Sequence, residues 1–110
     1  MPDYLQLAAG QTLTGQQVAA GGSLMYAITV PAGARNLSIR ILGGTGDASL
    51  FVKAGQMPAA DGSDADYASQ RPGNAEVVMV PAPKATTYYI RLLAVKDVAN
   101  ASVLATYTSP

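Results

Sequence analysis

Three aspartates in the segment DGSDADY form the densest group of metal-ligating side chains in the chain: Asp61, Asp64 and Asp66. Carboxylate oxygens are the ligands that Ca²⁺ prefers, so these residues are candidates for a calcium site. Their spacing differs from that of an EF-hand loop, and no glutamate follows to close a cage by bidentate coordination. We therefore expect a solvated polar loop without a metal ligand, and calcium is kept as the alternative.

The segment GGTGDAS, residues 43–49, has the glycine content of a phosphate-binding loop. A dinucleotide or phosphate loop needs a helix after the glycines, because the N-terminus of that helix holds the phosphate. Here Leu50–Lys53 alternates as a strand does, and no lysine of the Walker type follows. The pattern predicts a tight connection between two strands, in which Asp47 caps backbone amides.

The composition limits the catalytic chemistry of the chain. With no histidine and no cysteine, it contains no Ser-His-Asp or Cys-His nucleophile system and no zinc site of the usual nitrogen and sulfur type. Asp47, the Asp61 group and Glu76 are the candidate acids for glycosidase chemistry, but nothing in the sequence places one of them buried beside a second carboxylate. We expect no catalytic residue, and we expect Arg71 and Glu76 to pair across a Pro-Gly-Asn turn.

Length and charge narrow the class of protein further. The chain has 110 residues, which suits one domain, and its net charge is zero with 7 basic and 7 acidic residues. We do not expect the chain to bind nucleic acid. Neutralising phosphates requires clustered Lys or Arg, and the sequence has no such cluster. No apolar run approaches the roughly 20 residues of a membrane helix. The ends, residues 1–3 and 108–110, look like cut edges, so we expect a domain excised from a longer protein.

Alternation of apolar and polar residues, interrupted by Gly, Pro and Asn, recurs along the chain, whereas helical periodicity is almost absent. This pattern predicts an all-β fold, a single-domain antiparallel β-sandwich of about eight strands. The segment from Gln56 to Asn74 is expected to be a long polar loop. The expected strands are Tyr4–Ala8, Thr12–Val18, Ser23–Val30, Asn36–Ile41, Ser49–Lys53, Glu76–Val80, Tyr88–Ala94 and Ser102–Thr108.

One expected strand carries a candidate binding surface. Alternate residues from Tyr88 to Leu92 face the core, so Tyr89 and Arg91 face outward, and Phe51 on its own strand is a candidate to join them. Exposed aromatic side chains beside an arginine are typical of surfaces that bind proteins or polysaccharides. The alternative is ordinary cross-strand pairing on a solvated sheet face.

An ordered series of motifs resembles the bacterial pre-peptidase C-terminal domain family. The family is marked by a VPAG turn, a GDADLYV-like strand, a GN-x-E segment and a GTYYVRL-like strand, and the similarity extends from about Leu7 to Tyr107. The matching segments are ITVPAGA (28–34), LSI (37–39), GGTGDASLFV (43–52), PGNAE (72–76) and TYYIRL (87–92).

The resemblance implies a β-sandwich of jelly-roll type at the C-terminus of a secreted bacterial peptidase. It implies a non-catalytic accessory domain, often removed during maturation, that assists secretion or folding or binds insoluble substrate. Its implied partners are the attached peptidase domain and an insoluble protein such as collagen or a polysaccharide. A dedicated adhesion module for such material is one alternative, with Tyr89, Arg91 and Phe51 as its binding residues. An intramolecular chaperone or inhibitor of the attached protease is the other.

The chain also departs from the family pattern. Many members carry a cysteine pair at places that match Ala68 and Val77, so that disulfide is absent here. Thr86 replaces the glycine before the TYY motif. The turn Ala20–Tyr26 carries no carboxylate, which argues against the calcium site that the similar collagenase domains form at the matching turn.

Overall fold

The computed structural model describes residues 4–109, and the only regular elements in that range are β-strands. Residues 1–3 and 110, which belong to the ends expected to be cut edges, lie outside it. Within the described range there is no helix long and apolar enough to span a membrane. The strands are β1 (Leu5–Gln6), β2 (Thr12–Val18), β3 (Ser23–Thr29), β4 (Arg35–Leu42), β5 (Thr45–Ala54), β6 (Tyr67–Ser69), β7 (Glu76–Val80) and β8 (Thr87–Thr108).

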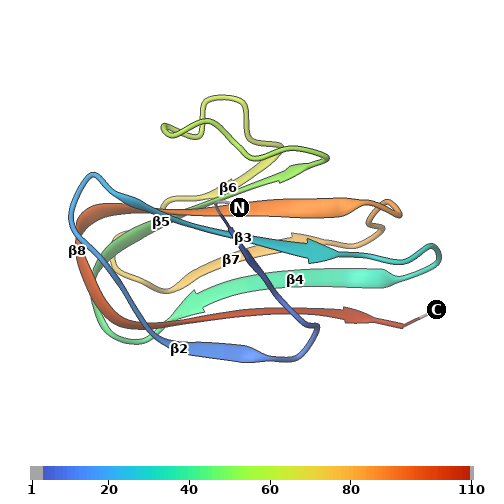
Figure 1. The fold of residues 1–110 in the computed structure, drawn as a ribbon, viewed down its shortest axis with the longest axis horizontal. Helices are drawn as coiled ribbons and strands as arrows, with labels where there is room; N and C mark the ends of the chain where they lie inside the picture. The colour runs from blue at the N-terminus through green and yellow to red at the C-terminus, as the bar shows by residue number, and fades with distance from the viewer. Residues whose placement is uncertain (1–3, 110) are drawn as a thin grey trace.

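The strands form a sandwich of two layers that share one strand, β8. Layer A has the order β1-β3-β8-β5-β6, and layer B has the order β7-β4-β8-β2. Every pairing is antiparallel except that of β1 with β3. Figure 1 shows β8 turning at one end of the molecule from one layer to the other. The expected all-β antiparallel sandwich is confirmed.

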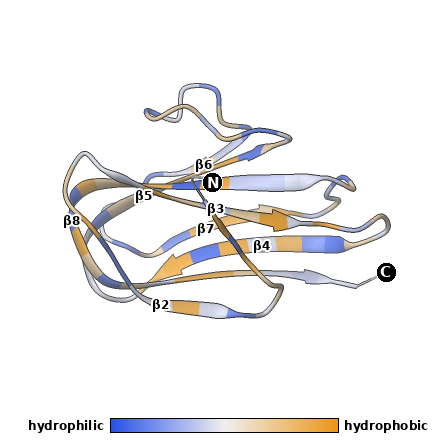
Figure 2. Ribbon diagram, viewed as in Figure 1, coloured by the Kyte–Doolittle hydropathy of each residue, from blue (hydrophilic) through white to orange (hydrophobic). Residues whose placement is uncertain are grey.

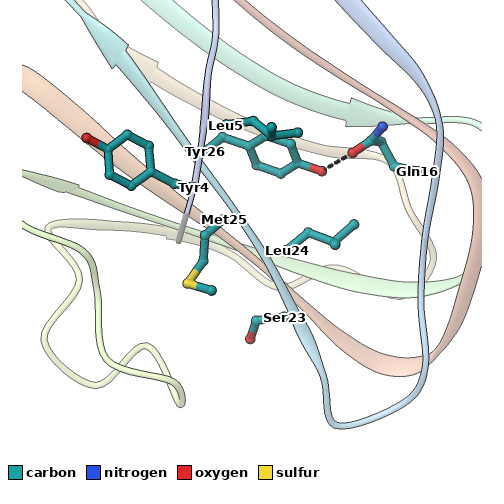
Figure 3. A pocket seen from close by; sticks show the side chains of 7 residues that line it. All are labelled: Tyr4, Leu5, Gln16, Ser23, Leu24, Met25 and Tyr26. Carbon is teal, nitrogen blue, oxygen red and sulfur yellow. Dashed lines mark hydrogen bonds between the residues drawn. The ribbon is translucent and has the colours of Figure 1, made fainter. Parts of the chain in front are cut away.

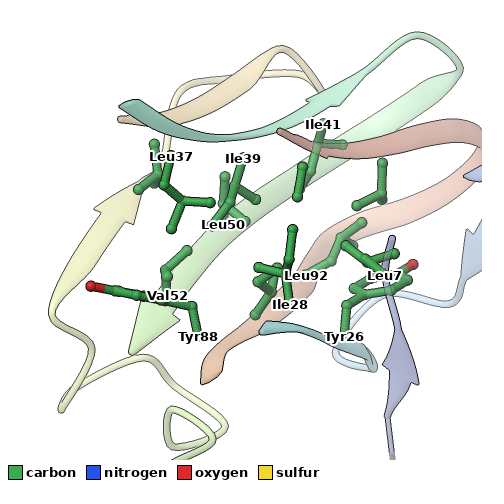
Figure 4. Close-up of a cluster of buried hydrophobic side chains, with 14 of the residues drawn as sticks. Leu7, Tyr26, Ile28, Leu37, Ile39, Ile41, Leu50, Val52, Tyr88 and Leu92 are labelled. Atoms are coloured by element: carbon green, nitrogen blue, oxygen red, sulfur yellow. The ribbon is translucent and has the colours of Figure 1, made fainter. Parts of the chain in front are cut away.

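The core lies between the two layers, and strand alternation explains its composition (Figure 4). On β4, for example, Leu37, Ile39 and Ile41 are buried whereas Arg40 is exposed. Figure 2 shows the matching change from apolar to polar residues along this strand. Side chains from both inner faces fill the space, as in other aligned sandwiches. The largest fully buried apolar side chains are Tyr26, Ile28, Val30, Leu37, Ile39, Ile41, Leu50, Val52, Pro58, Ile90, Leu92 and Val103.

The expected strands Tyr88–Ala94 and Ser102–Thr108 are parts of one continuous strand, β8. Its first half pairs with β3 and β5, and its second half pairs with β2 and β4. Even-numbered residues point into the core before the bend and odd-numbered residues after it. Asn100 has a φ of 59° at this change of phase. Asparagine tolerates this left-handed conformation better than most residues, so β8 bends here without ending.

The glycine segment lies directly against the bend of β8. A Cβ atom built on Gly44 would be 2.2 Å from the Ala99 carbonyl oxygen, and one on Gly46 would be 2.1 Å from the Asp97 carbonyl oxygen. Both residues have positive φ. Glycine is therefore needed for close approach of two backbones, as well as for the turn. The segment is not only a turn, because β5 begins at Thr45, ahead of the expected start.

Asp47 does not cap the turn. It lies in β5 opposite Lys96, and among the described residues its carboxylate makes no hydrogen bond that would cap an amide. The turn is held instead by the buried Asn74, whose Nδ2 donates to the Gly43 and Thr45 carbonyl oxygens at 2.9 Å each. Through these two bonds the Asn74 amide nitrogen fixes the β6–β7 connection against the β4–β5 turn.

Glu76 joins the two layers at the same end. Its Oε2 accepts hydrogen bonds from the Ser69 hydroxyl on β6 and from the Arg71 backbone NH. Among the described residues, Glu76 thus bonds to the backbone NH of Arg71, and the expected side-chain pairing of Arg71 with Glu76 is not formed. Because Glu76 is only 2% exposed, its carboxylate serves to hold these segments together and is not presented to solvent. Ser69 belongs to β6, a short strand paired with β5 inside the segment expected to be a loop.

Tyr26 is a core aromatic residue whose hydroxyl has a defined hydrogen-bond partner. Its side chain is 1% exposed, and its hydroxyl donates to Gln16 Oε1 of β2. Burial raises the pKa of Tyr26 well above the usual tyrosine value, because the phenolate would lose its hydration.

Replacing Gly46 with alanine should lower the free energy of unfolding by about 3 kcal/mol or more, because the new Cβ adds a backbone clash to the cost of a left-handed conformation. Gly43→Ala is the matched control. Gly43 also has positive φ, but nothing lies within 4 Å of its Cβ position, so a loss of only about 1–2 kcal/mol is expected. Urea unfolding of the two variants measures the difference, and equal losses would contradict the close-approach explanation.

Stability should fall as the pH rises above about 10, the ordinary tyrosine pKa, because Tyr26 then ionises in the unfolded chain and stays protonated in the folded one. The contribution of Tyr26 to this slope is at most about 1.4 kcal/mol per pH unit. Tyr26→Phe should cost about 1 kcal/mol near neutral pH through the lost hydrogen bond and should flatten the alkaline slope. Denaturant unfolding of both proteins between pH 8 and pH 11 tests this; parallel pH profiles would argue against it.

Candidate functional site

The tertiary structure brings the three candidate binding residues together on the outer face of layer A. Phe51 on β5 lies directly opposite Arg91 on β8. Tyr89 lies two residues before Arg91 on the same strand and opposite Lys53. The expectation that Tyr89 and Arg91 point away from the core is confirmed, since the residues that alternate with them are buried.

Phe51 does not belong to the exposed surface, although it lies on the outer face. It is 3% exposed, because the loop between β5 and β6 folds over its ring. A Cβ atom built on Gly62 would lie 2.3 Å from the ring, so this loop residue is in direct contact with it. The expectation of an exposed Phe51 was therefore wrong. The sequence pattern identified the face of the strand, but it carried no information about what covers that face.

Arg91 connects this loop to the sheet. Its Nε donates to the Pro58 carbonyl oxygen at 3.0 Å, and Pro58 itself is fully buried. The side chain is partly exposed, so its remaining guanidinium NH groups are available for an acceptor outside the protein. The same contact positions Arg91 and holds the loop over Phe51.

Tyr89 is paired with an aromatic residue that the sequence analysis did not select, Tyr4. The two rings meet edge to face with a centroid distance of 5.3 Å. Partial desolvation raises the pKa of Tyr89, and the hydroxyl of Tyr4 adds to the effect. Tyr4 precedes β1, and only the parallel pairing of β1 with β3 brings it to the outer face of layer A. No spacing in the sequence links the two tyrosines.

The three aspartates of the β5–β6 loop are hydrogen-bonded to separate backbone amides. Asp61 Oδ1 accepts from the Ser63 NH, Asp64 Oδ1 from the Ala59 NH, and Asp66 Oδ2 from the Ala54 NH. The bond from Ser63 lowers the pKa of Asp61. In residues 4–109 no three His, Cys, Asp or Glu side chains are grouped so that they would hold a metal ion. The aspartates therefore shape the loop that covers Phe51.

A shallow groove of about 340 Å³ lies beside this face, along the outer edge of β3 (Figure 3). None of its lining side chains is charged. The groove runs from Tyr4 to Gln16 on β2. The lining residues are Tyr4, Leu5, Gln16, Ser23, Leu24, Met25 and Tyr26.

The carboxylates considered for acid chemistry occupy unrelated environments. Glu76 is buried and bonded to Ser69, Asp47 is in β5 opposite Lys96, and Asp61 is in an exposed loop. Together these residues do not form the flanking pair that glycoside hydrolysis uses. The outer face of layer A instead presents two tyrosine rings beside an arginine, which together offer apolar surface and hydrogen-bond donors.

Relatives of the chain are named as proteases, one of them as an extracellular protease. It is 41% identical over 103 residues to the Extracellular protease of Xanthomonas campestris pv. campestris, covering 92% of this chain and 17% of that protein. It is 40% identical over 86 residues to the Zinc metalloprotease of Helicobacter pylori, covering 78% of this chain and 32% of that protein. It is also 40% identical over 86 residues to the Hemagglutinin/proteinase of Vibrio cholerae, covering 78% of this chain and 14% of that protein. The chain thus spans a third or less of the length of each of these relatives.

Solved structures share the fold over nearly the whole chain. The pre-peptidase C-terminal domain of collagenase from Bacillus anthracis superposes with a TM-score of 0.69 at 18% identity, covering 96% of this chain and 97% of that one. The solution structure of vEP C-ter 100 gives a TM-score of 0.67 at 27% identity, with 94% and 99% covered.

The family model for the bacterial pre-peptidase C-terminal domain matches residues 22–94. This range begins at the turn before β3, includes the glycine segment and the Asn74–Glu76 turn, and ends in the first half of β8. The chain therefore belongs to the bacterial pre-peptidase C-terminal domain family.

Proposed function

We propose that this chain is a non-catalytic accessory domain of a secreted bacterial peptidase, and that it holds the enzyme on insoluble protein substrate. The observation that carries the adhesion role is the pair of Tyr4 and Tyr89 beside Arg91 on the outer face of layer A. Its relatives, in which the matched segment is a small part of a protease, support the accessory role.

The chemistry of this surface suits a protein polymer. Tyrosine rings offer a large apolar face at a low entropic cost, and their hydroxyl groups bond to carbonyl and amide groups. Arg91 adds donors for backbone carbonyl oxygens, and its bond to Pro58 reduces the freedom that it would lose on binding. Phe51 contributes indirectly. Its buried ring packs against the β5–β6 loop, and that loop positions Arg91.

Weak contacts of this kind are sufficient when the target is a surface with many copies of the same site. Tethering a peptidase to such a surface raises the local concentration of cleavable chain without a tight individual site. This role needs no catalytic residue in the domain, and we expect the isolated chain to have no peptidase activity. Secretion or folding support, and removal on maturation, belong to the same proposal for the full-length protein.

Tyr89→Ala should reduce retention of the isolated chain on insoluble collagen by roughly tenfold, as expected when an interface aromatic is truncated. Tyr4→Ala should act in the same direction. Tyr67→Ala is the matched control, because Tyr67 is also exposed, at 37%, but lies on the edge strand β6. Sedimentation of labelled protein with the solid material gives the bound fraction.

Each result of that experiment is informative. Unchanged retention of both Tyr89→Ala and Tyr4→Ala would overturn the assignment of this face. Equal retention on collagen, chitin and cellulose would overturn the preference for protein and favour a general adhesion module. Absence of any retention of the unmodified chain would overturn the adhesion role, and peptidase activity of the isolated chain would overturn the accessory role.

A further inference from the structure

Layer B carries a second groove, between β4 and β7 at the end where β4 leads into β5. Its volume is about 340 Å³, which suits a short peptide segment or a small ligand better than a folded domain. We call it the β4–β7 groove. Its exposed lining residues are Arg40, Leu42, Arg71, Ala75 and Val77.

The strand register places a cation beside apolar surface in this groove. Arg40 on β4 lies directly opposite Val77 on β7. Side chains that are opposite each other in an antiparallel pair have Cβ atoms about 5 Å apart. Leu42 comes two residues after Arg40 and therefore lies on the same face of β4. Since Val77 and Leu42 are 39% and 44% exposed, the groove presents aliphatic surface next to a guanidinium group.

Both arginines of the groove are held in place by bonds that leave their charge without a partner. Arg40 Nε donates to Ser38 Oγ at 3.2 Å, and the backbone NH of Arg71 donates to Glu76 Oε2 at 3.1 Å. Among residues 4–109, no hydrogen bond joins either guanidinium group to a carboxylate. The remaining guanidinium NH groups of both residues are therefore available to a ligand.

The two strands of the groove present no exposed acidic side chain. β4 contains two arginines and no acid, and the one acid of β7, Glu76, is buried and accepts a hydrogen bond from the Ser69 hydroxyl. The exposed aspartates of the described chain lie in the β5–β6 loop and in the bend of β8. With two guanidinium groups and one buried carboxylate, the groove is positively charged and suits an anionic ligand.

The two ends of the described chain lie away from this groove. Tyr4 packs on Tyr89 at the outer face of layer A, which is the opposite layer. Thr108 at the end of β8 lies opposite Arg35, the first residue of β4, whereas the groove lies at Leu42, the last residue of that strand. At the rise of a β-strand these two residues are about 23 Å apart.

We propose that the β4–β7 groove binds the free C-terminal carboxylate of a peptide whose last residue is aliphatic. The carboxylate accepts hydrogen bonds from the guanidinium groups of Arg40 and Arg71, and the terminal side chain packs on Val77 and Leu42. Hydrogen bonds between a guanidinium and a carboxylate are stronger than neutral ones. Free C-termini are what a peptidase produces, so the site deepens the proposed function and rests on it in that one respect.

A chain end fits this groove better than an internal acidic residue does. In the last residue of a peptide, the carboxylate and the side chain are attached to the same Cα atom. They can therefore contact Arg40 and Val77 together, because these two residues are neighbours across the sheet. In an extended internal segment, the side chains next to an aspartate or glutamate point to the opposite side. Apolar contact would then have to come from a residue about 7 Å away.

The test measures binding of the peptide acetyl-Gly-Ala-Gly-Leu, with a free C-terminal carboxylate, to the isotope-labelled chain by following amide chemical shifts during a titration. The largest shifts should occur at Arg40, Leu42 and Val77. The same peptide with a C-terminal amide should bind at least about tenfold more weakly, because it cannot form the charged hydrogen bonds. Arg40→Gln and Arg71→Gln should each weaken binding of the acid by at least about fivefold and leave binding of the amide unchanged.

Arg35→Gln is the matched control, because Arg35 is also exposed on β4 and its replacement removes the same charge at the far end of the strand. It should bind the acid within about twofold of the unmodified chain, since exposed charges at that distance are screened by salt. Equal losses in Arg35→Gln and Arg40→Gln would indicate general attraction and overturn the site.

The peptides themselves supply the other outcomes. Equal binding of the acid and the amide would overturn the carboxylate contact. Equal binding of acetyl-Gly-Asp-Gly-Leu-amide would overturn the preference for a chain end and favour an internal acidic segment. The substituted arginines are exposed, so the variants should fold. Should one of them not fold, the comparison of the acid with the amide on the unmodified chain decides the question.

The outcome is separable from that of the collagen experiment. Tyr89→Ala changes only the outer face of layer A, so it should bind the peptide acid as the unmodified chain does. If this variant loses collagen retention and keeps peptide binding, both sites stand. If Tyr89→Ala retains collagen and Arg40→Gln still loses the peptide, the surface of the proposed function fails and the β4–β7 groove stands. If the peptide acid does not bind the unmodified chain, the groove fails alone.

Discussion

The sandwich depends on one close approach between backbones, at the point where β8 leaves layer A for layer B. A single strand that serves both layers must bend sharply and keep its hydrogen bonds on both sides. Gly44 and Gly46 allow β5 to follow that bend, because each of them occupies space that a Cβ atom would need. Asn100 lets β8 change the phase of its side chains at the same place. Both halves of the core then face each other.

Buried polar side chains hold the chain segments around this bend. Asn74 bonds to the turn before β5, and Glu76 bonds to β6 and to the chain that leads into β7. These bonds join loops that belong to different layers, at the end of the molecule where apolar side chains alone would not define the loop path. Each side chain is bonded through one terminal atom only, because Asn74 Oδ1 and Glu76 Oε1 are buried without a hydrogen-bond partner among the described residues. The bonds that do form favour one arrangement of the connections.

The outer face of layer A acquires its character from the β5–β6 loop. The loop is shaped by aspartates that bind its own amides, and it covers Phe51 and receives a hydrogen bond from Arg91. One aromatic residue is thereby removed from the surface. Tyr89 remains there and is joined by Tyr4. The same layer ends at the short parallel pair of β1 and β3, which carries Tyr4 to this face.

The sequence by itself determined the local character of each segment. Alternation around Leu37–Ile41 and Tyr88–Leu92 predicted strands and the faces that they bury, since the pleat of a strand fixes which side chains share a face. The absence of histidine and cysteine fixed which chemistries the chain lacks, and the ordered motifs indicated the family. Only the tertiary structure decided the rest. The fusion of two expected strands into β8, the burial of Phe51 and the meeting of Tyr4 with Tyr89 all depend on contacts between segments far apart in the chain. Such contacts leave no periodic signal in the sequence, because they are set by how strands pair and loops fold across them.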